Sequence, residues 1–171
     1  AIHRASDRQN GPFVALNCAA LAPSMMHREL FGHAPHAFTG ASRAGRAGRI
    51  AAADGGPLFL DEPAELSAAA PAALLRFLAD GPSRPLGEET PRQADVRLLA
   101  ATCARLDERV AEGRFRRDLF FRLGGAVLTL PPLRERDDLE ELARALLADL
   151  SEELGEPLTL PEAVLHALRQ H

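Results

Sequence analysis

The feature that most constrains the fold of this chain is residues 55–62, which read Gly-Gly-Pro-Leu-Phe-Leu-Asp-Glu. A short apolar run bounded by glycines and proline is typical of a strand buried on both faces, as in the middle of a parallel sheet. The run ends in two adjacent carboxylates, Asp61 and Glu62. Ligands of open α/β sheets bind beyond the carboxyl ends of the strands, so this pair is expected at the mouth of a site.

The acidic pair supports two interpretations. In a Walker B element, the Asp holds Mg²⁺ and the Glu polarises the water that attacks a γ-phosphate. A buried strand can also end in an acidic residue that serves only as the N-cap of the next helix. From this stretch alone both interpretations of Asp61 and Glu62 stay open.

Apolar runs and turn signals elsewhere predict an α/β fold with a parallel sheet, because strands alternate with helices. Asn17 ends one predicted strand and would share the sheet edge of Glu62 if the strands are parallel. Further strands are expected over residues 13–18, 96–103 and 126–130. Helices are expected over residues 24–31 with Ser24 as N-cap, 71–80, 106–112, 116–123, 138–154 and from 161 onward, the last two forming an all-helical tail.

Composition excludes several functional classes. The net charge of −4 over 171 residues predicts no electrostatic surface for nucleic acid. No apolar run in the sequence reaches the length of a membrane span, and neither a membrane segment nor a signal peptide is expected. Cys18 and Cys103 match no metal or redox spacing, so a reduced, cytoplasmic protein is expected. Residues 1–6 are typical of the last turns of a helix and the final helix lacks a stop signal, so both ends are expected to be cut.

Several short motifs follow one another in an order that resembles a known family. They are Asn17-Cys18-Ala19-Ala20, Glu29-Leu30-Phe31-Gly32-His33, Ala37-Phe38-Thr39-Gly40-Ala41, Leu58-Phe59-Leu60-Asp61-Glu62, residues 115–123 and Pro131-Pro132-Leu133-Arg134-Glu135-Arg136. Together they resemble the central AAA+ ATPase domain of bacterial enhancer-binding proteins, the activators of sigma-54-dependent transcription. The resemblance implies a Rossmann-like AAA+ core over residues 1–133, truncated at its start, and part of a helical lid subdomain over residues 134–171.

The resemblance also implies roles for residues at the expected sheet edge. Asp61 would hold Mg²⁺ and Glu62 would activate water. Asn17 would hold Glu62 away from that water until the assembly engages its target, since an amide can hydrogen-bond a carboxylate without changing its charge. Thr102 and Cys103 fall where the family has its sensor I, beside the γ-phosphate of ATP.

Two further elements of the family concern partners. Arg116 and Arg122 match arginine fingers, which a subunit of a hexameric ring supplies to its neighbour's ATP. Guanidinium suits this task because it stays charged and binds phosphate bidentately. The loop formed by His36, Ala37, Phe38, Thr39, Gly40 and Ala41 would contact sigma-54 RNA polymerase. The alternative for its Phe is a side chain folded back into the core; DNA would be reached only through a domain absent from this chain, and no membrane is implied.

The sequence departs from the family pattern in ways that keep two functions open. It contains no Gly-x-x-x-x-Gly-Lys-[Ser/Thr] phosphate loop and no sensor II arginine. His36 stands where the family has a Gly, Cys103 where it has Asn or His, and Pro63 directly follows Glu62. One hypothesis is an ATPase domain that couples hydrolysis to remodelling of sigma-54 RNA polymerase. The other is a non-catalytic pseudo-ATPase interaction module or inactive fragment.

Overall fold

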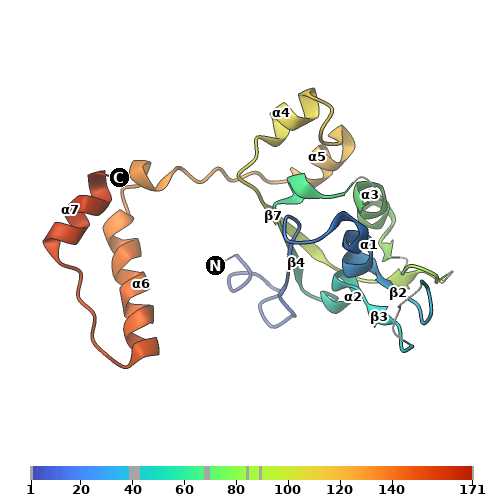
Figure 1. Ribbon diagram of the computed structural model, residues 1–171, viewed down its shortest axis with the longest axis horizontal. Helices are drawn as coiled ribbons and strands as arrows, with labels where there is room; N and C mark the ends of the chain where they lie inside the picture. Colours follow the sequence, from blue (N-terminus) through green and yellow to red (C-terminus); the bar gives the residue numbers. More distant parts are fainter. Residues whose placement is uncertain (1, 39–42, 68–69, 84, 89, 171) are drawn as a thin grey trace. The chain divides into compact units, whose positions relative to one another are not determined.

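The computed structural model describes residues 2–38, 43–67, 70–83, 85–88 and 90–170, and the chain divides into two compact units, Ala1–Ala126 and Val127–His171. The first unit is built on a three-stranded parallel sheet of β1 (Val14–Asn17), β4 (Pro57–Asp61) and β7 (Arg97–Ala101). The strand order is β1-β4-β7. The predicted α/β fold with helices flanking a parallel sheet is confirmed (Figure 1).

Helices and two small hairpin-like sheets complete the first unit (Figure 1). They are α1 (Pro23–Phe31), β2 (Gly32–His33) paired with β3 (Arg46–Ala47), α2 (Arg49–Ala52), the 3₁₀ helix η1 (Pro63–Glu65), α3 (Ala70–Asp80), β5 (Pro82–Ser83) paired with β6 (Arg92–Gln93), α4 (Leu106–Ala111) and α5 (Arg117–Leu123). The second unit carries a short 3₁₀ helix η2 (Leu133–Glu135), α6 (Leu139–Leu154) and α7 (Glu162–Gln170). No helix within the described residues is long and apolar enough to cross a membrane.

The sheet register brings the ends of the three strands to one edge. Asn17 lies opposite Asp61 on β4, and Asp61 in turn lies opposite Ala101 on β7. Gly56 allows β4 to start close to the segment that enters β1, because a Cβ there would overlap the carbonyl oxygen of Pro12. The residues that follow these strands therefore share one edge of the sheet.

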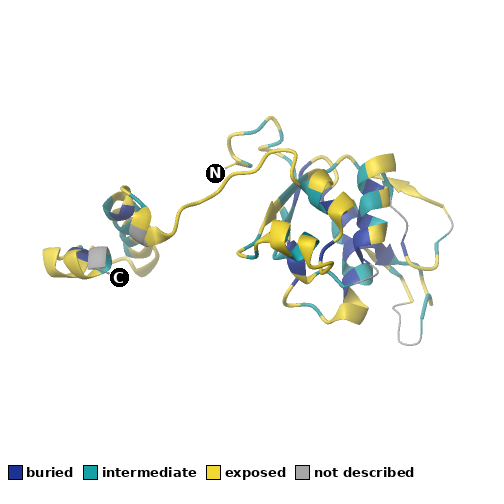
Figure 2. Cartoon of the chain, turned by 90° about the horizontal axis from the view of Figure 1, so that it is seen from above, coloured by how far each residue is buried: buried dark blue, intermediate teal, exposed yellow. Residues whose placement is uncertain are grey.

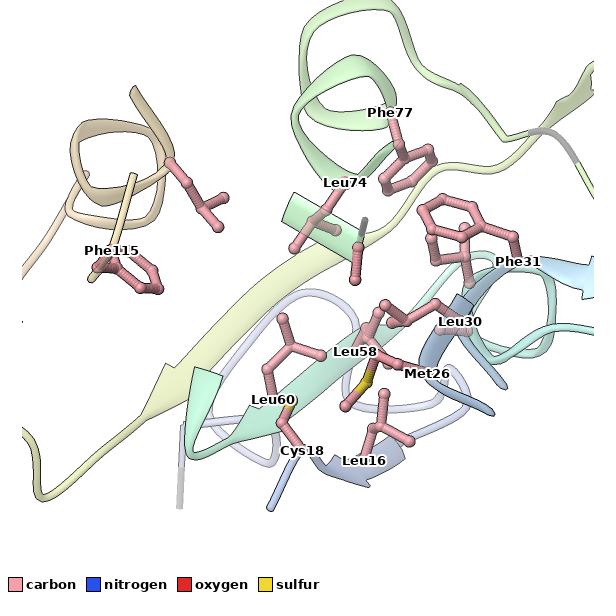
Figure 3. Packing of buried hydrophobic residues seen from close by; sticks show 14 residues of the cluster. Leu16, Cys18, Met26, Leu30, Phe31, Leu58, Leu60, Leu74, Phe77 and Phe115 are labelled. Carbon is pink, nitrogen blue, oxygen red and sulfur yellow. The ribbon is translucent and has the colours of Figure 1, made fainter. Parts of the chain in front are cut away.

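The core lies on one face of this sheet. Leu58 and Leu60 of β4 are fully buried and lie among side chains from β1, α1 and α3: Leu16, Met26, Leu30, Leu74 and Phe77 (Figure 3). Burying each such side chain contributes about 1.5–3 kcal/mol relative to exposure. Phe59 points the other way, stacks on Phe13 with ring centroids 6.2 Å apart and is only half-buried. The prediction that β4 is buried on both faces is therefore wrong for its second face.

Two other predicted features differ from the structure. Residues 126–130 do not form a strand, and Val127 and Leu128 are 74% and 78% exposed. An apolar, β-branched run becomes a strand only beside a strand whose backbone groups it can pair with, and none of the described strands pairs with this run. Ser24 is not the cap of α1: the N-cap is Ala22, and Pro23 occupies the first position, where its missing N–H costs nothing.

Burial differs between the units (Figure 2). Fully buried side chains gather in the first unit around the sheet. In the second unit, Leu139 of α6 and Leu165 of α7 are the buried hydrophobic residues among those described. Each of these helices therefore buries little more than one anchoring leucine.

Candidate active site

The carboxyl edge of the sheet gathers the polar residues predicted there from sequence. Asn17 ends β1, Asp61 ends β4, and Glu62 follows it directly. Thr102 and Cys103 follow the end of β7, and the N–H of Glu62 donates to the carbonyl oxygen of Ala101 at 2.8 Å. The parallel pairing of the strands thus brings residues from three distant parts of the sequence to one place.

Asn17 is held in one orientation. Its Oδ1 accepts hydrogen bonds from the backbone N–H groups of Ala19 and Ala20, at 2.9 and 3.1 Å. Its Nδ2 therefore points across the strands and donates to Oδ2 of Asp61 at 3.0 Å. The structure pairs Asn17 with Asp61 and not with Glu62, the partner expected from the sequence.

The Asp61 carboxylate fits a role as a single magnesium ligand. It lies at the exposed mouth of the sheet, is only partly buried and accepts one hydrogen bond within the described part of the chain. Mg²⁺ prefers hard oxygen ligands and commonly takes one or two carboxylates together with phosphate oxygens and waters. No group of three or more acidic, His or Cys side chains in the described residues could hold a metal alone. Asp61 would therefore bind the ion together with a phosphate-bearing ligand.

Glu62 has an unusual backbone conformation. Its φ of 51° and ψ of 57° place it in the left-handed region, which residues with a Cβ seldom adopt. The next residue is Pro63, which restricts the preceding backbone further. Glu62 stands at the N-cap position of η1, yet its side chain makes no capping hydrogen bond. The capping interpretation of Glu62 is therefore wrong, and its carboxylate points elsewhere.

The Glu62 carboxylate accepts hydrogen bonds from the two residues after β7. The Thr102 hydroxyl donates to Oε2 at 2.6 Å, and the backbone N–H of Cys103 donates to Oε1 at 3.1 Å. These bonds, with Thr102 making the largest contribution, hold the pKa of Glu62 below its usual value. The sequence placed Thr102 and Cys103 beside a nucleotide and did not reveal this pairing. Its only signal was the position of Thr102 near the end of the strand predicted over residues 96–103.

Both thiols near the edge favour the protonated form. Burial, followed by the charges of Asp61 and Glu62, raises the pKa of Cys18 to about 12. The hydrogen bond with Glu62 raises the pKa of Cys103, which is exposed. Because the thiolate is the reactive form of cysteine, this environment suits neither residue to nucleophilic catalysis. The chemistry of the edge therefore rests on its carboxylates.

The two candidate arginine fingers lie on α5. Arg116 is the N-cap residue of this helix and forms an exposed ion pair with Asp118, with Nη2 2.7 Å from Oδ2. Arg122 donates from Nη2 to the carbonyl oxygen of Leu78 in α3. Between them Phe121 is 70% exposed. The hydrogen bonds that the structure gives these arginines thus go to α5 and α3 rather than to Asp61 or Glu62.

The predicted sigma-54 loop is described only in part. Phe38 is half-buried: the Cζ of Arg28 lies 4.5 Å from its ring centroid, and the His33 ring meets it edge-on at 5.1 Å. His36 has a φ of 58°, the conformation that a Gly would adopt freely. Phe38 therefore packs back against α1 and β2. Ala37 is also described, whereas the predicted loop residues Thr39, Gly40 and Ala41 lie outside the described residues.

The chain is similar to several bacterial regulatory proteins. A family model described as the Sigma-54 interaction domain matches residues 1–129. The "Acetoin catabolism regulatory protein" of Cupriavidus necator is 47% identical over 171 residues, which cover 100% of this chain and 25% of that protein. The "DNA-binding transcriptional regulator NtrC" of Escherichia coli is 49% identical over 156 residues, which cover 91% of this chain and 33% of that protein.

Solved structures show the same fold. The crystal structure of NtrX from Brucella abortus in complex with ADP matches with a TM-score of 0.87 and 32% identity, and covers 99% of this chain and 37% of that one. The structure of the same protein in complex with ATP matches with a TM-score of 0.82 and 33% identity over 94% of this chain and 35% of that one. The chain thus spans about a quarter to two fifths of the length of these relatives.

Proposed function

The chain belongs to the Sigma-54 interaction domain family, and we propose that it supplies the sigma-54-contacting, ATP-hydrolysing part of a bacterial transcriptional activator. The regulatory names of the relatives and the ADP and ATP complexes of NtrX support this proposal. The activity would couple ATP hydrolysis to remodelling of sigma-54 RNA polymerase in the cytoplasm.

The observation that carries the proposal is the geometry of the acidic pair. Asp61 leaves a partly exposed carboxylate at the mouth of the sheet, suited to Mg²⁺. Glu62 holds an ionised carboxylate next to it, since its hydrogen bonds lower its pKa. A bound magnesium ion would neutralise charge on the phosphates of ATP. Glu62 would accept a hydrogen bond from the attacking water and orient it.

The arginines of α5 would complete the site from a neighbouring copy. Arg116 and Arg122 lie at the start and near the end of a helix whose exposed Phe121 lines a shallow, open surface hollow together with Arg116, Arg117 and Asp118. An arginine finger has to stay charged and reach a phosphate that belongs to another subunit. We therefore propose a homo-oligomer, a ring in which α5 of one subunit faces the nucleotide of the next.

The decisive test is Glu62→Gln in the full-length natural protein. The amide keeps the size of the side chain and removes its charge, so ATP turnover should fall by about 100-fold or more, while ATP binding survives. Glu153→Gln, the same change at an exposed position of α6, should leave turnover unchanged. Turnover that is unaltered by Glu62→Gln would refute the role of Glu62.

The partner is tested separately with Phe38→Ala. This change removes the aromatic ring that packs on Arg28 and His33 and leaves the acidic edge intact. We expect ATP turnover close to wild type and loss of sigma-54-dependent activation in a purified transcription assay. Normal activation by this variant would remove Phe38 from the contact with sigma-54.

A further inference from the structure

We propose that Thr102 is a positioning residue of this site, whose hydroxyl, together with the backbone N–H of Cys103, holds the Glu62 carboxylate in its working place. The inference rests on the proposed function, because it requires Glu62 to act on a water molecule. It gives Thr102 a role different from the nucleotide contact that sequence resemblance implied for it.

Both oxygens of the Glu62 carboxylate accept a hydrogen bond. Oε2 accepts from the Thr102 hydroxyl at 2.6 Å, and Oε1 accepts from the Cys103 N–H at 3.1 Å. A hydrogen bond from a hydroxyl to an ionised oxygen at this distance belongs to the short, strong, charge-assisted class. Two donors on consecutive residues fix the rotation of the carboxylate as well as its position.

The hydroxyl of Thr102 donates one hydrogen bond and accepts another. Its oxygen accepts a hydrogen bond from the backbone N–H of Ala104 at 3.0 Å. A hydroxyl carries one proton, and in this structure that proton is donated to Glu62. The turn after β7 thus orients the donor before any ligand binds.

Because the backbone at Glu62 is fixed, the position of its side chain depends on the hydrogen bonds from Thr102 and Cys103. Glu62 sits in the left-handed region immediately before the buried Pro63, and Arg109 of α4 donates to the carbonyl oxygen of Ala64 at 3.2 Å. Backbone strain of this kind persists where the surroundings over-determine it, and it clusters at functional sites. With the turn fixed, the remaining freedom of Glu62 lies in its side chain, which Thr102 restrains.

Asn17 does not take this role in the structure. Its oxygen is engaged by two backbone N–H groups and its amide donates to Asp61. In this structure the Glu62 carboxylate is therefore placed by Thr102 and Cys103 and not by Asn17.

The test compares Thr102→Val with Thr102→Ser in the full-length protein. Valine matches the shape of threonine and removes the hydroxyl, so kcat for ATP hydrolysis should fall by about 10- to 100-fold, as misplacing a catalytic group by about 1 Å does. The KM for ATP should stay within about threefold. Serine restores the donor and should recover kcat to within about threefold of wild type. Thr159→Val, the same change in an exposed segment, serves as the matched control.

Each outcome decides the proposal. An unchanged kcat in Thr102→Val overturns it, and so does a raised KM at unchanged kcat, which would make Thr102 a nucleotide contact. A kcat that Thr102→Ser fails to restore in a folded protein also overturns it. If the wild type hydrolyses ATP and Glu62→Gln does not, a normal Thr102→Val refutes this inference alone. If the wild type does not hydrolyse ATP, both the proposed function and the inference fall. A crystal structure of Thr102→Val should show the Glu62 carboxylate displaced from the end of β7.

Discussion

The acidic edge of the sheet and helix α5 carry opposite charges and are built in opposite ways. At the edge, Asp61 accepts a hydrogen bond from the last residue of β1, and Glu62 accepts two from the residues that follow β7. On α5, Arg116 bonds a residue two positions away, and Phe121 is largely exposed. The first region is assembled by long-range contacts of a single chain. The second is attached to the core by the buried Leu119 and by the bond from Arg122 to the Leu78 carbonyl, but leaves Arg116 and Phe121 facing outward.

This difference has a functional meaning. Hydrolysis of a phosphoanhydride needs negative groups to hold a cation and a water, and positive groups to stabilise the charge that develops on phosphate. The chain positions the negative groups internally. Arg116 and Arg122 are exposed on α5 and bond Asp118 and the Leu78 carbonyl rather than this edge, which fits our proposal that they act on the nucleotide of a second copy.

The largest effect should come from removing the proposed arginine fingers, Arg116 and Arg122. We expect Arg122→Ala, and separately Arg116→Ala, to lower ATP turnover by about 1,000-fold, the lower end of the range for arginine fingers. ATP binding, measured by fluorescence or calorimetry, should survive in both variants. These losses would occur in variants whose acidic edge is intact.

Mixing variants distinguishes action within one subunit from action between two. An Arg122→Ala subunit keeps Glu62, and a Glu62→Gln subunit keeps Arg122. In a mixed oligomer some interfaces contain both functional groups, so turnover should reappear although each variant alone is inactive. Mixed oligomers that form and stay inactive would show that Arg122 acts within its own subunit and would break the comparison.

Substitutions in the two regions should also differ in their effect on the free energy of unfolding. Leu60 is fully buried in the strand that carries the acidic pair. Leu60→Ala should therefore lower the free energy of unfolding by about 2–5 kcal/mol. Phe121→Ala on α5 should change it by less than about 0.5 kcal/mol, because this ring is mostly exposed. Urea denaturation of both variants measures the difference. A cost for Phe121→Ala similar to that of Leu60→Ala would mean that α5 is not an outward-facing element.

The sequence could predict the acidic edge because it depends on strand identity alone. An apolar run with glycines before it and carboxylates after it predicted β4, and parallel pairing then required Asn17 and the acidic pair to share an edge. Thr102 was placed at this edge only by the family resemblance. The choice of partners within that edge could not be predicted. Whether Glu62 reaches Asn17 or Thr102 depends on the left-handed turn at Glu62, a tertiary feature with no sequence periodicity.

The same limit explains the strand that was predicted and does not form. Residues 126–130 have the composition of a strand, but composition does not state whether a partner strand exists. Val127 and Leu130 are 74% and 80% exposed in the structure. Prediction succeeded where a pattern decides the structure by itself and failed where a second segment decides it.

A smaller effect should appear at alkaline pH, and it belongs to the acidic edge. The folded chain raises the pKa of Cys18 from 9.0 to about 12, chiefly by burial. Between these values the folded state keeps a proton that the unfolded state releases, so stability falls as pH rises above about 9. The sequence contains neither lysine nor tyrosine, and few other groups titrate in this range.

We therefore expect the free energy of unfolding to drop by roughly 2–3 kcal/mol between pH 8 and pH 11. Cys18→Ala should remove most of this slope, whereas Cys103→Ala, at an exposed thiol, should keep it. Denaturant titrations at several pH values measure all three proteins. An unaltered slope in Cys18→Ala would show that Cys18 is not protected by folding.

The smallest effect should come from the ion pair that holds Arg116. Asp118 accepts from Arg116 at 2.7 and 3.1 Å, and both side chains are about half exposed, at 52% and 51%. Exposed ion pairs contribute little to stability because water and salt screen them, so Asp118→Asn should shift Tm by less than about 2 °C. Turnover should change by less than about tenfold, since the guanidinium of Arg116 stays in place to bind phosphate. A loss as large as that of Arg116→Ala would mean that Asp118 orients the finger before it meets its partner. Arg116 would then be held in its working position by its own chain, as Glu62 is. The two regions would differ only in whether the holding residue is near in sequence, as Asp118 is, or distant, as Thr102 is.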